Sequence, residues 1–301
     1  MSSSMAAVIG TVSIGIGHTQ VTELFASLDI PNMCDKTYGK LHAELSQKID
    51  EQNTFLMKEA ALEEAQIATE FKEVNGKQIP IVSVVVDGAW SKRSYRSNYS
   101  ALSGVACIIG AKSKKIIYMG VRNKHCFICN RQNNKDHDCY KNWNGTSTAM
   151  EASIILEGFK TSIPTNNLIH GKLIGDGDSS VFKKLNEAAP YGPTYTIEKL
   201  ECRNHLLRNY ITKISELSKE SQFPITIRKQ ITSSDVLGRL RNAVTKAIAY
   251  RKNTTEPLYM QVELLKKDIE NGPLHVFGNH LSCASYFCTK STEKVISTIQ
   301  F

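Results

Sequence analysis

Acidic residues stand next to apolar segments at two places where the sequence predicts the end of a β-strand. Asp87 follows the β-branched run 79–86, and Asp176 and Asp178 alternate with glycines after a second apolar segment, 168–174. Strand ends in an open α/β sheet present ligand-binding groups, and neighbouring glycines admit close approach. Carboxylate oxygens are the ligands that Mg²⁺ and Mn²⁺ prefer. The sequence therefore predicts a divalent-cation site at Asp87 and Asp176, with Asp178 as the alternative to Asp176.

A third acidic residue, Glu151, belongs to the predicted helix 147–159, whose apolar residues keep helical spacing. Thr148 is a candidate N-cap, which places Glu151 at the third helical position. Two roles stay open for Glu151: it supports the bound cation, or it caps the helix. Each aspartate alone is also typical of a turn. Acids on two separate strands, with another on the helix between them, favour the metal site.

A compact group of cysteine and histidine residues lies between the predicted third strand and this helix. The group consists of Cys126, Cys129, His137 and Cys139. CxxC followed by HxC offers the ligands of a closed tetrahedral zinc site. The intervening residues are too polar to hold their shape by packing, so a metal would stabilise this loop. His125 is an alternative ligand, and reduced surface cysteines without metal are the competing interpretation.

A second predicted zinc site combines residues that are far apart in the chain. Its members are Cys202, His205, His280, Cys283 and Cys288. A CxxH motif at the start of a helix presents both ligands on one face, since three-residue spacing returns to that face. Closing the site would pin the intervening helices onto the sheet. Alternatively, Cys202 is buried and His205 is satisfied within the core. His275 is interpreted as a core residue at a strand end, without a role in metal binding.

Positive charge is concentrated in one part of the sequence. Lys and Arg number 37 against 29 Asp and Glu, a net charge of +8, and the stretch 199–252 alone has twelve basic and four acidic residues. This excess predicts a polyphosphate partner such as DNA, although a solvated helical face is the alternative. The predicted contacts with the DNA backbone are Arg203, Arg208, Lys213, Arg228, Lys229, Arg239 and Arg241.

The order of apolar segments predicts an α/β fold in three regions. Residues 1–74 form an N-terminal helical region, residues 75–217 a mixed α/β core that contains the Cys/His loop 125–139, and residues 218–301 a basic helical region with the last Cys/His residues. In the core, three strands form an antiparallel meander and βα units follow. The predicted strands are 79–86, 99–109, 115–121, 168–174 and 194–200.

The N-terminal region and the hydropathy pattern restrict the function further. Predicted helices at 18–28 and 41–71, separated by a proline-containing turn, could form a DNA-binding helix-turn-helix, but two packed helices without that role are commoner. No apolar run approaches the ~18 residues of a membrane span. The N-terminal stretch has no Lys or Arg before its apolar residues, so we do not expect a secretory signal.

Several motifs occur in the order found in one family. They are VDGAW at 86–90, NWNGTSTAME at 142–151, IGDGDSS at 174–180, ECRNH at 201–205, and HVFGNH with two later cysteines at 275–288. Together these motifs resemble Mutator-like transposases, most closely the animal branch known from insect genomes. The resemblance extends from about residue 15 to the end of the sequence.

The resemblance implies a ribonuclease H-like core with Asp-Asp-Glu metal chemistry, split by a helical insertion. Asp87 matches the first catalytic aspartate of the family and Asp176 the second, with Asp178 as the alternative. Glu151 matches the place where ribonucleases H carry a helix glutamate. The third catalytic carboxylate follows the insertion and an Asn-rich stretch in the family, so we expect it beyond Phe301.

Cofactors and partners also follow from the resemblance. The family reaction is Mg²⁺- or Mn²⁺-dependent cleavage of a phosphodiester by water, followed by attack of the new 3′ hydroxyl on target DNA. Transposon ends and target DNA are therefore the implied partners, and the nucleus is the implied location. Cys202 and His205 match the Cys/His motif of the family, and Zn²⁺ would be structural. No membrane is involved, and association into homo-oligomers is left open.

Two other interpretations belong to different classes. One is a domesticated, zinc-containing DNA-binding protein that no longer cleaves, and the other is a fragment of a transposon gene without function. Whether the chain is an enzyme depends on the third carboxylate, which has no match before Phe301. A reading frame that continues into an Asn-rich segment with a glutamate would favour the transposase.

Overall fold

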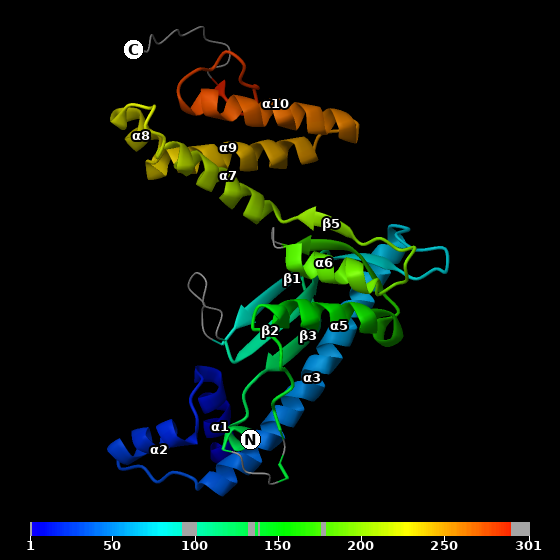
Figure 1. Cartoon of the computed structure of the whole chain (residues 1–301), viewed down its shortest axis with the longest axis vertical. Helices are drawn as coiled ribbons and strands as arrows, with labels where there is room; N and C mark the ends of the chain where they lie inside the picture. The colour runs from blue at the N-terminus through cyan, green and yellow to red at the C-terminus, as the bar shows by residue number, and fades with distance from the viewer. Residues whose placement is uncertain (1, 92–100, 132–135, 138, 176–178, 290–301) are drawn as a thin grey trace. The chain divides into compact units, whose positions relative to one another are not determined.

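The structure is a computed structural model that describes residues 2–91, 101–131, 136–137, 139–175 and 179–289 (Figure 1). It divides the chain into two compact units, Met1–Leu200 and Glu201–Phe301. The three-region division expected from the sequence stays a prediction. Asp176 and Asp178 lie outside the described residues.

Three helices precede the sheet. They are α1 (Ser3–Ile14), α2 (His18–Ser27) and α3 (Asp35–Glu70). The sequence predicted α2 and most of α3 but not α1, whose apolar residues had been considered only as a signal sequence. Helix α1 packs on α3, where the hydroxyl groups of Thr11 and Tyr38 lie 2.8 Å apart. The helix-turn-helix interpretation of α2 and α3 stays a prediction.

A five-stranded mixed sheet follows these helices. Its strands are β1 (Ile81–Trp90), β2 (Ser103–Gly110), β3 (Ile116–Asn123), β4 (Ile169–Gly175) and β5 (Glu198–Glu201). The strand order is β3-β2-β1-β4-β5. Strands β1, β2 and β3 pair antiparallel, and β4 pairs parallel to β1. The predicted mixed α/β sheet, an antiparallel meander followed by βα units, is confirmed.

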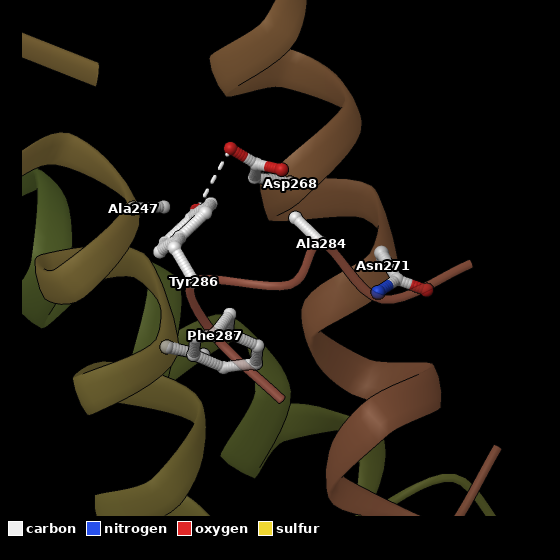
Figure 2. Close-up of a pocket in the computed structure, with 7 residues that line it drawn as sticks. Ala247, Asp268, Asn271, Ala284, Tyr286 and Phe287 are labelled. Atoms are coloured by element: carbon white, nitrogen blue, oxygen red, sulfur yellow. Dashed lines mark hydrogen bonds between the residues drawn. The ribbon is translucent and has the colours of Figure 1, made fainter. Parts of the chain in front are cut away.

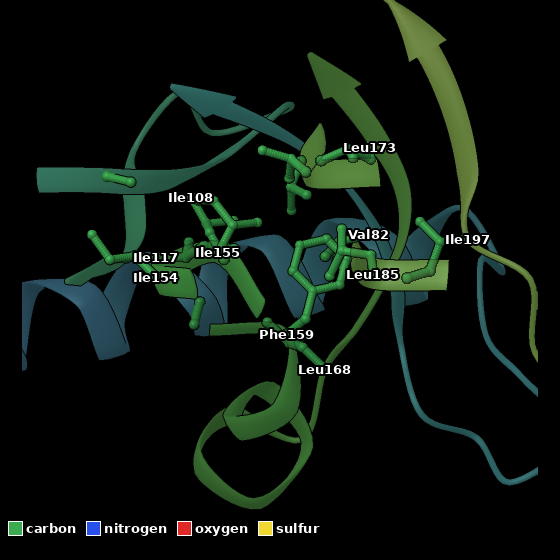
Figure 3. Close-up of a cluster of buried hydrophobic side chains, with 14 of the residues drawn as sticks. Val82, Ile108, Ile117, Ile154, Ile155, Phe159, Leu168, Leu173, Leu185 and Ile197 are labelled. Carbon is green, nitrogen blue, oxygen red and sulfur yellow. The ribbon is translucent and has the colours of Figure 1, made fainter. Parts of the chain in front are cut away.

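The core of the first unit lies where α5 (Ala149–Asn166) and α6 (Ser179–Ala188) pack next to the sheet. Figure 3 shows Phe159 of α5 among side chains from β1, β4 and α6. The apolar residues that predicted α5 from their helical spacing, Met150, Ile154, Ile155 and Phe159, are each 0 % exposed. Their complete burial fixes α5, and with it Glu151, against the strands.

A buried carboxylate joins α3 to the turn between β2 and β3. Glu64 is 1 % exposed. Its Oε1 accepts hydrogen bonds from the backbone N–H groups of Lys112 at 3.0 Å and Ser113 at 2.6 Å. A Cβ at Gly110 would overlap the Glu64 carboxylate, so only glycine leaves room for it. This contact provides an acceptor for the backbone N–H groups of Lys112 and Ser113 in the turn.

Replacement of Glu64 by Ala should lower the free energy of unfolding by about 3 kcal/mol, because two backbone N–H groups lose their acceptor. Urea unfolding followed by circular dichroism would measure the change. The neighbouring Glu63 is the matched control, since it forms only an exposed ion pair with Lys115 at 2.6 Å. Glu63→Ala should therefore cost less than about 1 kcal/mol. Equal effects of the two substitutions would contradict the role assigned to Glu64.

The second unit is helical. It contains α7 (Arg203–Leu217), α8 (Ile225–Ile231), α9 (Ser234–Lys252) and α10 (Leu258–Val276). Helix α10 packs along α9, and α7 contributes Tyr210, Ile211 and Ile214 to a small apolar cluster with Val236 and Leu240. The helical character predicted for this region is confirmed.

A polar contact locks the segment after α10 onto α9 and α10. Arg251 donates to both carboxylate oxygens of Asp268, at 2.6 and 3.1 Å. The Tyr286 hydroxyl donates to Asp268 at 2.8 Å, as Figure 2 shows. The Tyr286 ring stacks on Tyr250 with centroids 3.7 Å apart. The hollow beside them is about 10 Å³, room for one water at most. This arrangement is packing and does not form a ligand site.

Candidate functional site

Asp87 lies where β1 loses one of its two neighbours. Pairing of β1 with β4 ends at Val85, opposite Ile174, whereas pairing with β2 continues through Trp90. Asp87 is thus within β1 and does not end it, which corrects the position expected from the sequence. The strand continues because β2 still supplies hydrogen-bond partners. The carboxylate is next to an open part of the sheet edge.

The surroundings of Asp87 leave its carboxylate accessible. The residue is exposed, and its Oδ1 accepts a hydrogen bond from the N–H of Gly88 at 2.9 Å. Cys107 lies directly opposite on β2. Burial, together with the nearby Asp87 charge, raises the pKa of the Cys107 thiol, so the thiol stays protonated at neutral pH. Asp87 therefore has a solvent-accessible carboxylate.

Glu151 lies over the residue next to Asp87. A Cβ at Gly88 would be 3.0 Å from the carboxyl carbon of Glu151, so glycine makes room for this carboxylate. Side chains alternate between the faces of a strand. Glu151 lies on the face of β1 to which a side chain at Gly88 would point, and in a regular strand the side chain of Asp87 points to the other face. The two acids are close along β1, but they could bind one cation only around the end of the sheet.

The start of α5 is fixed by contacts with the strands. Trp90 donates through Nε1 to the carbonyl of Ser147 at 3.2 Å, and the buried Ser147 hydroxyl donates to the carbonyl of Ala101 at 2.8 Å. Thr148 is the N-cap residue but has a helical backbone and makes no side-chain capping bond, so its predicted capping role is wrong. Glu151 does occupy the third helical position, as predicted.

The glycine before Asp176 approaches the residue before Asp87. A Cβ at Gly175 would lie 3.7 Å from Cγ2 of Val86. Because β1 and β4 are parallel, the two strands run in the same direction past this point. The described residues thus bring Val86 and Gly175, which directly precede Asp87 and Asp176 in the sequence, close together. Asp176 and Asp178 themselves lie outside the described residues.

Cys126, Cys129, His137 and Cys139 converge as the sequence predicted. Their ligand atoms all lie within 4.8 Å of one another. The Sγ atoms of Cys129 and Cys139 are 3.5 Å apart, and His137 Nε2 is 3.3 Å from Cys126 Sγ. In a tetrahedral zinc site, Zn–S bonds of about 2.3 Å place two sulfurs about 3.8 Å apart. The group could hold a metal such as zinc, and His125 is not a member of it.

The protonation of these thiols is compatible with metal binding. A hydrogen bond from the backbone N–H of Cys129, with a contribution from His137, lowers the pKa of Cys126 to about 6. The thiols of Cys139 and Cys126 raise the pKa of Cys129 to about 11. Cys126 is the N-cap of the short helix α4 (Phe127–Asn130) and is therefore the first thiolate to form. A thiolate is the form that ligates metal.

A second group converges at the end of α10: His275, His280, Cys283 and Cys288. Nδ1 of His275 is 3.2 Å from Nδ1 of His280 and 3.3 Å from Sγ of Cys283, and His280 Nδ1 is 3.4 Å from Sγ of Cys288. Tetrahedral Zn–N bonds of about 2.05 Å would place two nitrogens about 3.4 Å apart. This group could therefore also hold a metal such as zinc.

His275 was missed by the sequence interpretation. It lies in the last turn of α10, so the expectation of a strand-end core residue is wrong. Burial, and the neighbouring His280 and Arg239, lower the pKa of His275 and favour the neutral imidazole that binds metal. The Asn271 amide donates to Cys283 Sγ at 3.4 Å and would orient this ligand. The spacing His-x4-His-x2-Cys-x4-Cys was the available signal.

A sequence model of Mutator-like transposases matches residues 2–288 of the chain. The chain belongs to the Mutator-like transposase family. No curated protein matches it. The matched range includes Asp87, Glu151 and every member of both Cys/His groups. No helix in the described part of this Mutator-like transposase is both long and apolar enough to cross a membrane.

Cys202 and His205 of the Mutator-like transposase do not join the later histidines and cysteines. Cys202 is the N-cap of α7 and His205 lies in its first turn. Among the described residues, neither belongs to a group of three or more potential ligands. Nδ1 of His205 is buried and has no hydrogen-bond partner there. The structure thus replaces this pair by His275 in the second candidate metal site.

The predicted DNA-contacting residues of the transposase all lie on α7, α8 and α9. Arg228 is half-buried, whereas the side chains of Arg203, Arg208, Lys213, Lys229, Arg239 and Arg241 are exposed. Lys213 pairs with Glu216 at 2.8 Å, and Arg239 approaches Asp235 at 3.9 Å. Such exposed pairs hold the charges weakly, so the basic side chains stay available to an anionic partner.

Proposed function

We propose that the chain carries the divalent-cation site of a ribonuclease H-like transposase core. Asp87 and Asp176 are the proposed Mg²⁺ or Mn²⁺ ligands, with Asp178 as the alternative and Glu151 in support. The proposal depends above all on the approach of Gly175 to Val86, since these residues directly precede the two aspartates. Consecutive Cα atoms are about 3.8 Å apart, which limits how far Asp176 can be from Asp87.

The proposed chemistry is phosphodiester cleavage and strand transfer. A divalent cation held by these carboxylates would supply activation of a water or 3′ hydroxyl and stabilisation of the leaving oxygen. Asp87 is exposed, and in the described part of the chain its carboxylate accepts a local hydrogen bond from the N–H of Gly88, which leaves lone pairs for a cation. Glu151 lies at the start of α5, over Gly88, and is proposed to support the cation from around the end of the sheet.

Zinc at the two Cys/His groups is proposed to be structural. Both groups consist of Cys and His ligands, which suit Zn²⁺, and each provides four ligands with no position left for substrate. One group would stabilise the polar loop between β3 and α5, and the other the segment after α10. DNA, as transposon ends and as target, is the proposed partner of the basic helices, and the nucleus the proposed location. The proposal allows homo-oligomers but does not assign an oligomeric state.

Incubation with labelled DNA tests the function. The substrate is a duplex carrying the ends of the element that encodes the chain, and the cofactors are Mg²⁺ or Mn²⁺ with EDTA as the control. Metal-dependent strand cleavage at the element ends supports the transposase core. Binding without cleavage, also in a longer protein that includes the third carboxylate, would instead favour a domesticated zinc-containing DNA-binding protein. That second candidate is favoured by the basic helices, which need no catalytic site to bind DNA.

A further inference from the structure

An open groove lies between α7 and α9 within the second unit. Its volume is about 440 Å³. The apolar side chains of Leu207, Ile211 and Leu237 line it together with Arg208 and Arg241. Leu207 is buried and both arginines are exposed, so the groove has an apolar floor and charged sides.

The charge of the groove is not neutralised by its neighbours. In the part of the chain that the structure describes, neither Arg208 nor Arg241 forms an ion pair. The acids of the two helices face other bases, since Glu216 pairs with Lys213 and Asp235 with Arg239. A guanidinium presents several N–H donors in a planar fork that matches phosphate oxygens. Two unpaired guanidinium groups on one groove therefore favour an anion with more than one phosphate.

Polar groups and a glycine complete the groove. Asn204 and Thr212 line it one turn before and one turn after Arg208, so three polar side chains form a stripe along α7. On α9, the lining residue next to Leu237 is Gly238, and a Cβ there would meet nothing within 4 Å. The backbone of α9 is thus open to close approach, which an extended sugar–phosphate chain could use.

We propose that this groove binds the sugar–phosphate backbone of DNA, with Arg208 and Arg241 each contacting a phosphate. The proposal rests on the DNA-binding function proposed above and assigns a defined site to it. Backbone phosphates are the same in every sequence, so the groove would contribute affinity without sequence preference. The other basic residues on α7, α8 and α9 would add electrostatic attraction around the groove.

The salt dependence of DNA binding tests the groove. Fluorescence anisotropy measures the affinity of the full chain for a labelled duplex at several salt concentrations. Each lost phosphate contact should reduce the slope of log K against log[salt] by about 0.9. The variant Arg208→Gln/Arg241→Gln is therefore expected to have a slope shallower by about 1.8 and an affinity lower by about 10²-fold. Circular dichroism and zinc content verify that the variant is folded.

A double variant outside the groove is the matched control. Lys246 on α9 and Lys266 on α10 are exposed and do not line the groove. Lys246→Gln/Lys266→Gln removes the same charge and should keep the slope of the unaltered chain. If both double variants lose the same slope, only net charge matters and the groove proposal is overturned. If the unaltered chain binds no DNA, the proposed function itself fails.

A charge-neutral substitution gives a second, independent test. Gly238→Phe would fill the groove from α9 without changing any charge, and we expect at least a tenfold loss of affinity. Gly238→Ala is its control, because the small methyl group leaves the groove open and alanine favours the helix. The alanine variant should bind DNA normally and melt at a higher temperature. Normal binding by the folded phenylalanine variant would overturn the proposal.

Discussion

In a protein that also carries the third carboxylate, replacement of Asp87 by Asn is expected to lower the rate of metal-dependent DNA cleavage about 10³-fold. The amide removes one charged ligand of the proposed cation site, and a loss of roughly 4 kcal/mol in transition-state stabilisation corresponds to that factor. The affinity for Mn²⁺, measured by isothermal titration calorimetry, should fall as well. This second measurement does not depend on cleavage. Both effects follow from the proposal that Asp87 holds the catalytic cation.

The fold should tolerate this change. Asp87 is exposed, and its Oδ1 accepts a hydrogen bond from the adjacent Gly88, so Asn can accept the same bond. The free energy of unfolding should change by less than about 0.5 kcal/mol. Asp50→Asn on the exposed surface of α3 is the control for loss of one negative charge. Unchanged cleavage and unchanged Mn²⁺ affinity in Asp87→Asn would remove Asp87 from the site.

The sheet was predictable because the hydrophobic pattern of the strands differs from that of the helices. The β-branched run before Asp87 can be buried only as a strand in the centre of a sheet, and β1 is flanked by β2 and β4. The spacing of Met150 and Phe159 likewise allowed only a helix with one buried face, and both are fully buried. Helix α1 was not predicted, because its apolar residues are distributed around the helix and do not mark one face. Only packing against α3 in the folded chain distinguishes the buried residues Val8 and Thr11.

The local Cys/His group was predictable, whereas the distant pairing was not. Cys126 to Cys139 are near in sequence, so loop closure costs little entropy and spacing alone indicates their convergence. Assigning Cys202 to the later residues required a three-dimensional arrangement that spacing cannot supply. His275 was overlooked because it was expected at a strand end, whereas it lies in α10, which continues to Val276. One more helical turn brings this imidazole to His280.

The second large effect concerns zinc. The purified chain should contain two zinc ions, and His275→Ala or Cys283→Ser should each reduce the content to one. Structural zinc in such sites contributes about 10–16 kcal/mol. Loss of one ligand in four would therefore cost about 3–4 kcal/mol, or about 10²–10³-fold in affinity. Cys126→Ser should empty the other site and leave the group at the end of α10 occupied.

Cys202→Ser separates the two possible ligand sets. We expect this substitution to leave both zinc ions bound, because His275 and not Cys202 completes the group with His280, Cys283 and Cys288. If Cys202 and His205 were ligands instead, Cys202→Ser would release zinc and His275→Ala would not. Metal analysis of the variants after dialysis, with competition by a chromogenic chelator, measures the difference. A full zinc content in His275→Ala would contradict the geometry, since its Nδ1 is 3.3 Å from Cys283 Sγ.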